Sequence, residues 1–195
     1  MNNNKERTLV LLKPDSVRRG IAGEIISRFE KSGLKIVGLK MIWVDDELVK
    51  KHYPSDREEF LIGMGKKTLE TYAKYGKDPN EELGTMDPKE IGLLVNGWNI
   101  EFMSSGPVIA VVLEGFHAID NVRRLAGFTI PSAANPGTIR GDYSVDSNDV
   151  ANGLKRSVRN IVHASGNPEE AKYEIELWFR ENEIFSYNRA DESVM

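Results

Sequence analysis

The sequence predicts a single α/β sandwich with a ferredoxin-like core. Three observations support this fold class. Apolar runs rich in β-forming residues recur along the chain, segments with helical periodicity lie between them, and the resulting order is β-α-β-(α)-β-α-β-α. The 195 residues are enough for one domain with a sizeable core, and 40% hydrophobic with 29% charged residues is typical of a globular protein.

Four segments are expected to form strands. Residues 8–12, TLVLL, and residues 107–115, PVIAVVLEG, are apolar on both faces and are therefore predicted to be buried. Residues 34–44, LKIVGLKMIWV, form a further strand, and residues 160–165, NIVHAS, form a short fourth one. The first strand is expected to end at KPDS, because proline cannot continue the hydrogen bonding of a sheet.

Helices are expected between these strands. Apolar residues recur at helical spacing within residues 23–32, and a glycine follows that stretch. Asp45 is an N-cap candidate for a short helix, and residues 117–127 form another helix that ends at a glycine. The last helix begins after Asn167, where an N-cap residue, a proline and a glutamate follow one another, and is expected to run to about Glu181.

The stretch between Tyr53 and Ser104 is polar and rich in Gly and Lys. It has too few apolar residues for a core of its own, so we interpret it as an inserted helical hairpin or lid, at about residues 61–98, and not as a separate domain. Residues 1–195 are thus expected to form one domain.

Composition and charge exclude several classes of function. The formal net charge of −4 is a poor basis for nucleic-acid binding, although a local basic pocket is compatible with phosphate. The chain has no cysteine, which excludes disulfides, thiolate catalysis and cysteine-based metal sites. The first residues lack the apolar core of a signal peptide, and the longest apolar run, residues 107–115, is too short to span a bilayer. We therefore expect a cytoplasmic protein without a membrane partner.

Three motifs that suggest other sites do not fit their patterns. GMGKKT, residues 63–68, lacks the earlier glycine and the correctly placed Ser or Thr of a phosphate-binding P-loop, so it is interpreted as a solvated loop and helix start. Three aspartates do not match a calcium-binding loop, and turn or cap roles are favoured for the last two of them: Asp142, Asp146 and Asp149. The three histidines lie far apart without ligand spacing, so no metal site is predicted: His52, His117 and His163.

Several cations lie where an anionic ligand could bind. Lys13 follows the first strand and precedes a predicted helix, and ligand-binding sites of α/β proteins commonly lie at such strand ends. A lone lysine at this position is nevertheless more often solvated. Arg140 lies in PGTIRGDY, residues 136–143, whose glycines allow a ligand to approach the backbone and whose arginine suits phosphate. Arg123 and Arg124 lie in a helix, so one of them can face a site while the other faces solvent.

The last helix places a carboxylate where a core residue is expected. Ala171, Ile175 and Trp178 form an apolar stripe at helical spacing, and Glu174 falls on that stripe. Because an unpaired buried charge is costly, Glu174 either reaches the rim of the core or orients a histidine. His163 precedes this helix and is a candidate partner. The pattern alone leaves it as a core residue, a loop residue or a nucleophile.

Together these segments resemble the nucleoside diphosphate kinases. The resemblance rests on ERTLVLLKPDSVRRGIAGEIISRFEKSGLKIVGLKM from Glu6, SGPVIAVVLEG from Ser105, PGTIRGDY, NIVHASG and EIELWF. It implies a four-stranded antiparallel sheet with helices packed on it. It also implies a ping-pong reaction in which ATP gives its γ-phosphoryl group to a histidine, here His163, and a nucleoside diphosphate then takes it. Phosphoryl transfer depends mainly on positioning and charge neutralisation, and a neutral imidazole is a good nucleophile.

The resemblance also assigns supporting roles. It implies phosphate contacts from Lys13, Arg123, Arg140 and the Thr129 hydroxyl, and a sugar and phosphate contact from Asn160. Ser165 and Glu174 match the pair that supports the histidine, Tyr53 matches a residue that packs beside it, and Phe60 is a candidate for stacking on the base. Mg²⁺ is expected to arrive on the nucleotide phosphates, because the chain offers no strong carboxylate cage. A homo-oligomer is implied, commonly a hexamer.

Some residues depart from the family pattern. Gly166 stands where an acidic residue is usual, Ala164 replaces a glycine, and Phe128 and Ile130 stand where polar residues are common. The stretch from residue 142 to residue 159 is longer than in compact members. The insertion is left open as a lid over the nucleotide or a clamp between subunits. The alternative function is a non-catalytic nucleotide-binding or interaction module on the same fold.

Overall fold

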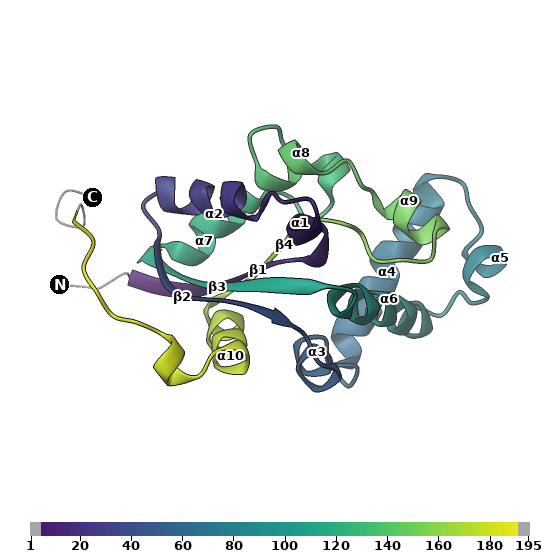
Figure 1. The fold of residues 1–195 in the computed structure, drawn as a ribbon. Coiled ribbons are helices and arrows are strands. Elements are labelled where there is room, and N and C mark those ends of the chain that lie inside the picture. Colours follow the sequence, from purple (N-terminus) through teal and green to yellow (C-terminus); the bar gives the residue numbers. More distant parts are fainter. Residues whose placement is uncertain (1–4, 191–195) are drawn as a thin grey trace.

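The computed structural model describes residues 5–190. Its centre is one sheet of four strands: β1 (Lys5–Leu12), β2 (Lys35–Trp43), β3 (Pro107–Phe116) and β4 (Val162–Ala164). The strand order is β2-β3-β1-β4, and every neighbouring pair is antiparallel (Figure 1). This confirms the predicted fold class. The fourth strand is shorter than expected, because the backbone turns sharply at Ile161.

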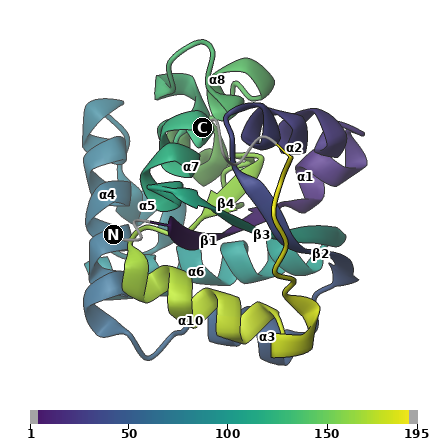
Figure 2. The same cartoon turned by 90° about the vertical axis from the view of Figure 1, so that its left-hand side faces the viewer.

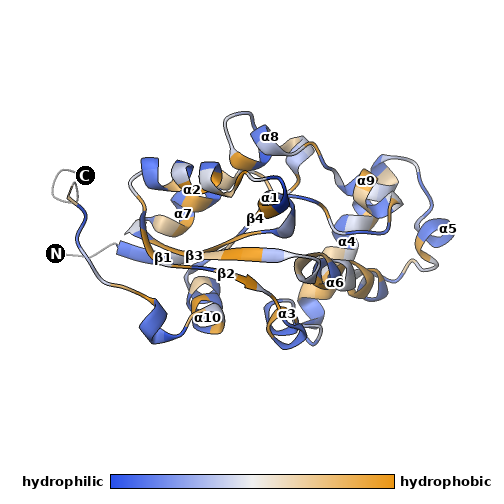
Figure 3. Cartoon of the chain, viewed as in Figure 1, coloured by the Kyte–Doolittle hydropathy of each residue, from blue (hydrophilic) through white to orange (hydrophobic). Residues whose placement is uncertain are grey.

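Helices cover both faces of the sheet. On one face lie α2 (Ala22–Lys31) and α7 (Ala118–Ala126), and on the other lie α3 (Asp46–His52) and α10 (Pro168–Trp178), as Figures 1 and 2 show. Successive residues of β1 point to opposite faces, so Val10 packs in one core and Leu11 in the other. Burial on both faces explains why the strands are continuous apolar runs. The middle of β3 is correspondingly hydrophobic in Figure 3.

The remaining elements are mostly short. They are α1 (Pro14–Arg18), α4 (Glu58–Lys74), α5 (Pro79–Leu83), α6 (Pro88–Ser104), η1 (Pro131–Ala133), α8 (Ile139–Tyr143), α9 (Asn148–Gly153) and η2 (Glu181–Glu183).

The stretch expected to hold a helical hairpin contains the long helices α4 and α6, which pack together (Figure 1). Two glycines permit this close approach. A Cβ atom at Gly65 would collide with the backbone of Pro88, and one at Gly92 would collide with the backbone of Leu61. Gly65 and Gly92 therefore serve helix packing.

The C-terminal part departs from the predicted boundary. α10 ends at Trp178, three residues before the expected end, because Phe179 adopts an extended backbone and packs on β2 beside Gly38. The chain then runs along β2, where the Phe185 N–H donates to the Val37 carbonyl at 2.7 Å. Among residues 5–190, no helix combines the length and the apolar character needed to cross a membrane.

Candidate active site

Lys13 lies at the junction between β1 and α1. Pro14 begins α1, so the strand stops there and leaves the Lys13 side chain only 6% exposed. Its Nζ donates to Asn160 Oδ1 at 2.8 Å. Burial lowers the pKa of Lys13 to about 8; the Arg140 cation also lowers it, whereas Asp15 acts in the opposite direction. The result is a buried cation beside an amide.

A strained turn brings Asn160 and His163 to the same region. Ile161 has φ of +73°, a conformation that is costly for a β-branched residue. Asp15 Oδ2 accepts from the Ile161 N–H at 3.1 Å, and the Ile161 carbonyl accepts from the Lys13 N–H at 2.9 Å. These bonds hold the turn in place. The role of Asp15 was absent from the sequence-based predictions, because its partner lies 146 residues away.

His163 and Glu174 form the pair that the last helix indicated. His163 lies in β4 opposite Leu11, and its Nε2 is 2.7 Å from Glu174 Oε1. Ser165 Oγ donates to the other carboxylate oxygen at 2.6 Å, and Glu174 is 4% exposed. With Nε2–H donating to the carboxylate, Nδ1 carries the lone pair. Nδ1 makes no hydrogen bond within the described part of the chain.

The electrostatic surroundings keep this histidine neutral. Burial lowers the pKa of His163, and the neighbouring Lys13 and Arg140 cations lower it further. Burial raises the pKa of Glu174, while the hydrogen bond from Ser165 acts against that rise. At neutral pH the ring is therefore an uncharged nucleophile next to fixed positive charge.

Arg140 is held rigidly by backbone carbonyls. Its Nη1 donates to Gly127 at 2.7 Å, its Nη2 to Val162 at 2.8 Å and its Nε to Asn160 at 3.3 Å. A guanidinium has five N–H donors, so donors remain for a ligand. Burial lowers the pKa of Arg140 to about 10, and the Arg123 cation adds to this effect.

These side chains line a cavity of about 460 Å³. Eight of the predicted site residues contribute to its wall: Lys13, Tyr53, Phe60, Arg123, Thr129, Arg140, Asn160 and His163. The other two, Ser165 and Glu174, lie behind His163 and bond to it directly or through each other. The cavity thus joins a neutral imidazole, several cations and an aromatic ring.

Comparison with known proteins identifies this arrangement. A family model described as nucleoside diphosphate kinase matches residues 6–64 and 97–184, which is most of the chain. The chain belongs to the nucleoside diphosphate kinase family. It is therefore an enzyme of nucleotide phosphotransfer.

Individual relatives agree with this kinase assignment. A nucleoside diphosphate kinase of Pyrobaculum aerophilum is 51% identical over 179 residues, covering 92% of this chain and 97% of that protein. The crystal structure of an NDP kinase from the same organism has a TM-score of 0.90 at 49% identity and covers 93% of this chain and 100% of that one. A transition-state mimic of the Borrelia burgdorferi enzyme, with bound vanadate and ADP, has a TM-score of 0.77 at 38% identity, covering 96% and 95%.

The cavity is also lined by residues of α4 and α6, among them Lys67, Thr68, Val95 and Trp98. The first three lie between residues 64 and 97, a stretch that the family model does not match. The segment GMGKKT lies within α4, so it is neither a P-loop nor the loop that we expected. Lys67 and Thr68 nevertheless line the same cavity, because they lie on a side of α4 that also carries Phe60 and Met64.

Glu170 fills the place next to Gly166. The Gly166 N–H donates to Glu170 Oε2 at 2.7 Å, and a Cβ atom at Gly166 would collide with that oxygen and lie 3.5 Å from Arg123 Nη1. A carboxylate from the first turn of α10 therefore occupies the space beside Gly166.

The three aspartates have partners other than a metal. Asp142 bonds to Arg28 at 2.7 Å, Asp146 to Arg156 at 2.6 Å and Asp149 to Lys77 at 2.6 Å. The N-cap of α9 is Ser147, so the cap role expected for Asp146 or Asp149 was wrong. The Ser147 hydroxyl accepts from the Val150 N–H, whereas the Asp146 and Asp149 carboxylates form ion pairs with their neighbouring cations.

The histidines are closer than their sequence positions suggested. The rings of His52 and His163 have centroids 4.6 Å apart, and with Glu174 they form a cluster whose ligand atoms lie within 4.8 Å of one another. Sequence separation was thus a poor guide to the distance between these two histidines, because the fold brings α3, β4 and α10 together at one place.

Proposed function

We propose that His163 carries the phosphoryl group between a nucleoside triphosphate, such as ATP, and a nucleoside diphosphate in a ping-pong reaction. The bond from His163 Nε2 to Glu174 supports this assignment most directly, because it leaves Nδ1 as the unprotonated nitrogen of a cavity-lining ring. Family membership supports the reaction class.

Each half-reaction follows from these groups. Nδ1 attacks the γ-phosphorus, the bond from phosphorus to the bridging oxygen breaks, and the nucleoside diphosphate leaves with the electron pair of that bond. Lys13, Arg123 and Arg140 neutralise the charge on the phosphates. Glu174 stabilises the positive ring of the phosphohistidine. A terminal oxygen of the second nucleoside diphosphate then attacks phosphorus, and the P–N bond breaks.

Other cavity residues hold the nucleotide. Thr129 and Asn160 offer polar groups to phosphate and sugar, and Phe60 offers a ring on which any base can stack. Stacking does not distinguish one base from another, so broad specificity for the base is expected. Tyr53 lines the same cavity as His163, and its ring packs edge-on against His52.

Mg²⁺ is proposed to enter with the nucleotide. Among the described residues that line the cavity, none is Asp or Glu, whereas a protein-held Mg²⁺ needs oxygen ligands. The phosphate oxygens would supply those ligands, and the metal would offset part of the phosphate charge. Removal of Mg²⁺ by EDTA is expected to abolish transfer, and its return is expected to restore it.

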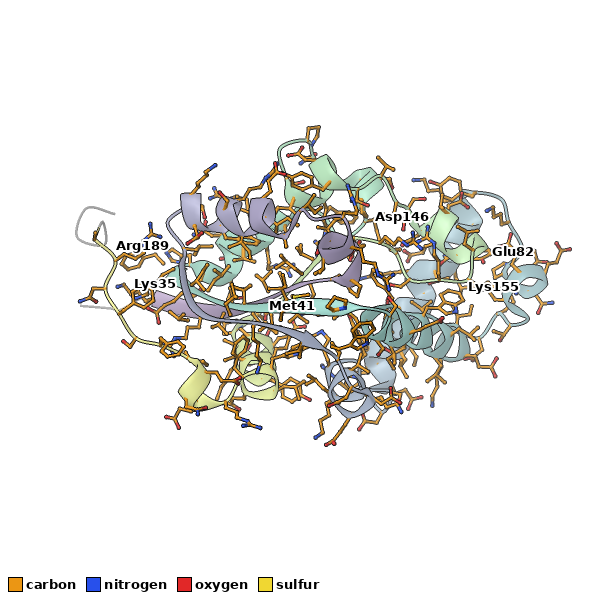
Figure 4. The ribbon with its side chains drawn as sticks, in the orientation of Figure 1. Lys35, Met41, Glu82, Asp146, Lys155 and Arg189 are labelled. Carbon is orange, nitrogen blue, oxygen red and sulfur yellow. The ribbon has the colours of Figure 1, made fainter. Side chains whose placement is uncertain are left out.

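A homo-oligomer, in the form of a hexamer, is also proposed. β2 is an edge strand, and three alternate residues on it are exposed, Leu39 by 52%, Met41 by 57% and Trp43 by 68% (Met41 is labelled in Figure 4). An exposed apolar edge of this kind is typical of an interface. Analytical ultracentrifugation should give a smaller species for Trp43→Glu than for the wild type. The cytoplasmic location stays a prediction.

The experiment for His163 is a label-transfer assay. Wild-type protein incubated with [γ-³²P]ATP should acquire an acid-labile, base-stable label and pass it to GDP. His163→Asn should acquire none. His117→Asn is the matched control, because His117 is exposed and lies at the start of α7, away from the cavity lining. Label on His163→Asn, or nucleotide binding by the wild type without labelling, would refute the proposal.

A further inference from the structure

His52, the last residue of α3, is a buried histidine that the proposed reaction does not use. Its side chain is 1% exposed, and its Nε2 has no hydrogen-bond partner among the described residues. Burial lowers the pKa of His52 to about 3, so the ring is neutral at neutral pH. A buried polar group without a partner is costly, and an apolar ring of similar size would avoid that cost.

Trp178 anchors this ring. The indole Nε1–H donates to His52 Nδ1 at 3.3 Å, although the two residues are 126 positions apart. Since an indole only donates, Nδ1 must carry the lone pair and the His52 proton lies on Nε2. Trp178 follows Glu174 by one helical turn, and both are buried on the same face of α10.

The anchored ring packs against His163. The two imidazoles meet edge-on, with centroids 4.6 Å apart and an angle of 85° between their planes. The bond from Glu174 restrains His163 at one ring atom, Nε2, so the orientation of the ring plane also depends on what packs against the rest of the ring. A ring that stands perpendicular to His163 restrains this plane.

We propose that His52 is a positioning residue that holds the plane of the His163 ring, and that Trp178 keeps His52 in place. α10 would then control the nucleophile twice, through Glu174 at Nε2 and through the Trp178–His52 pair at the ring plane. This inference rests on the proposed role of His163 as phosphoryl carrier. The direction of Nδ1 depends on both restraints, and the rate of phosphoryl transfer depends on that direction.

Two variants distinguish the packing of the His52 ring on His163 from the hydrogen bond between His52 and Trp178. His52→Asn keeps an acceptor near the position of Nδ1, so Trp178 stays paired, but it removes the ring that packs on His163. The double variant His52→Phe/Trp178→Phe keeps a ring beside His163 and removes both the indole donor and the need for an acceptor. The full-length chain is used for each variant.

The measurement is the single-turnover rate of protein labelling by [γ-³²P]ATP, together with the dissociation constant for ADP. His52→Asn is expected to be labelled at least about tenfold more slowly, because a small misplacement of a reacting group can cost about 10²-fold. Its affinity for ADP should stay within about twofold of the wild type. The double variant should recover most of the wild-type rate.

Three results would overturn the inference. One is a wild-type labelling rate in His52→Asn. Another is a loss of ADP affinity in His52→Asn in proportion to the loss of rate, which indicates general loosening of the fold. The third is a double variant as slow as His52→Asn, which indicates that ring packing is not the cause. Absence of label on His163 in the wild type would instead refute the proposed function.

Discussion

Replacement of Glu174 by Gln tests how the carboxylate acts on His163. Gln has nearly the same shape, so its amide oxygen can still accept from Nε2–H and its NH₂ group can donate to Ser165 Oγ, which now donates to the carboxylate at 2.6 Å. The substitution removes the negative charge and leaves the geometry. It therefore isolates the electrostatic contribution of a carboxylate that lies 2.7 Å from Nε2.

The size of the effect follows from that geometry. A hydrogen bond to a charged group contributes ~1.5–3 kcal/mol, against ~0.5–1.5 kcal/mol for a neutral one, so the lower estimate of the loss is about 1–1.5 kcal/mol. Two unit charges ~4 Å apart, at an effective dielectric constant of ~20, interact by ~4 kcal/mol, which sets the upper bound. We expect phosphorylation of His163 to slow by about 10- to 100-fold.

The assay is rapid-quench labelling with [γ-³²P]ATP, alongside the dissociation constant for ADP. That constant should stay within about twofold, because Glu174 lies behind His163 and is not part of the cavity wall. Glu176→Gln, an exposed change on the same helix, serves as the control and should have the wild-type rate. An unchanged rate in Glu174→Gln would show that the carboxylate is protonated or makes no electrostatic contribution to phosphorylation of His163.

Four further predictions concern the cavity and its supports. Lys13 loses its charge as the pH rises through about 8, instead of near 10.5, so kcat/KM for ATP should fall above pH 8, and Lys13→Arg should lack this alkaline limb. Arg140→Lys should lower both the Tm and the affinity for ATP, because an ammonium cannot reach all three carbonyls that the guanidinium bonds; a wild-type Tm would contradict this. Phe60→Ala should raise KM for each nucleoside diphosphate and leave kcat nearly unchanged, because about 1–3 kcal/mol of stacking free energy is lost. A selective loss of kcat would exclude the stacking role. Ile161→Gly removes a fully buried side chain, and the cavity costs about 2–5 kcal/mol, more than the ~1–3 kcal/mol of strain relieved at φ +73°, so the Tm should fall and labelling should slow; a Tm at or above the wild-type value, measured by calorimetry, would contradict this.

Much of the site was predictable because local pattern carries its signals. Lys13 follows an apolar run and precedes a proline, which places it at a strand end without knowledge of any distant contact. Glu174 falls on an apolar helical stripe, which predicts that it faces inward. The inward carboxylate then pointed to a histidine partner, and the structure provides His163 as that partner.

Boundaries and caps were less predictable, since alternatives of similar energy compete for them. Ser147 caps α9 while the neighbouring Asp146 pairs with Arg156, a choice that depends on where the arginine lies in space. The end of α10 at Trp178 likewise depends on Phe179, which gains more by packing on β2 than by extending the helix.

The division between local and tertiary information is clear around His163. Periodicity, strand ends and family motifs were sufficient for the fold class and for eight of the residues that line the cavity, because each is encoded within a few turns or one strand, whereas Lys67 and Thr68 were not predicted there. Tertiary packing alone decided that His52 rests on Trp178 and that Asp15 supports Ile161, as their partners lie 126 and 146 residues away. Such contacts depend on how antiparallel strands and helices come into register, and no short stretch of sequence contains that register.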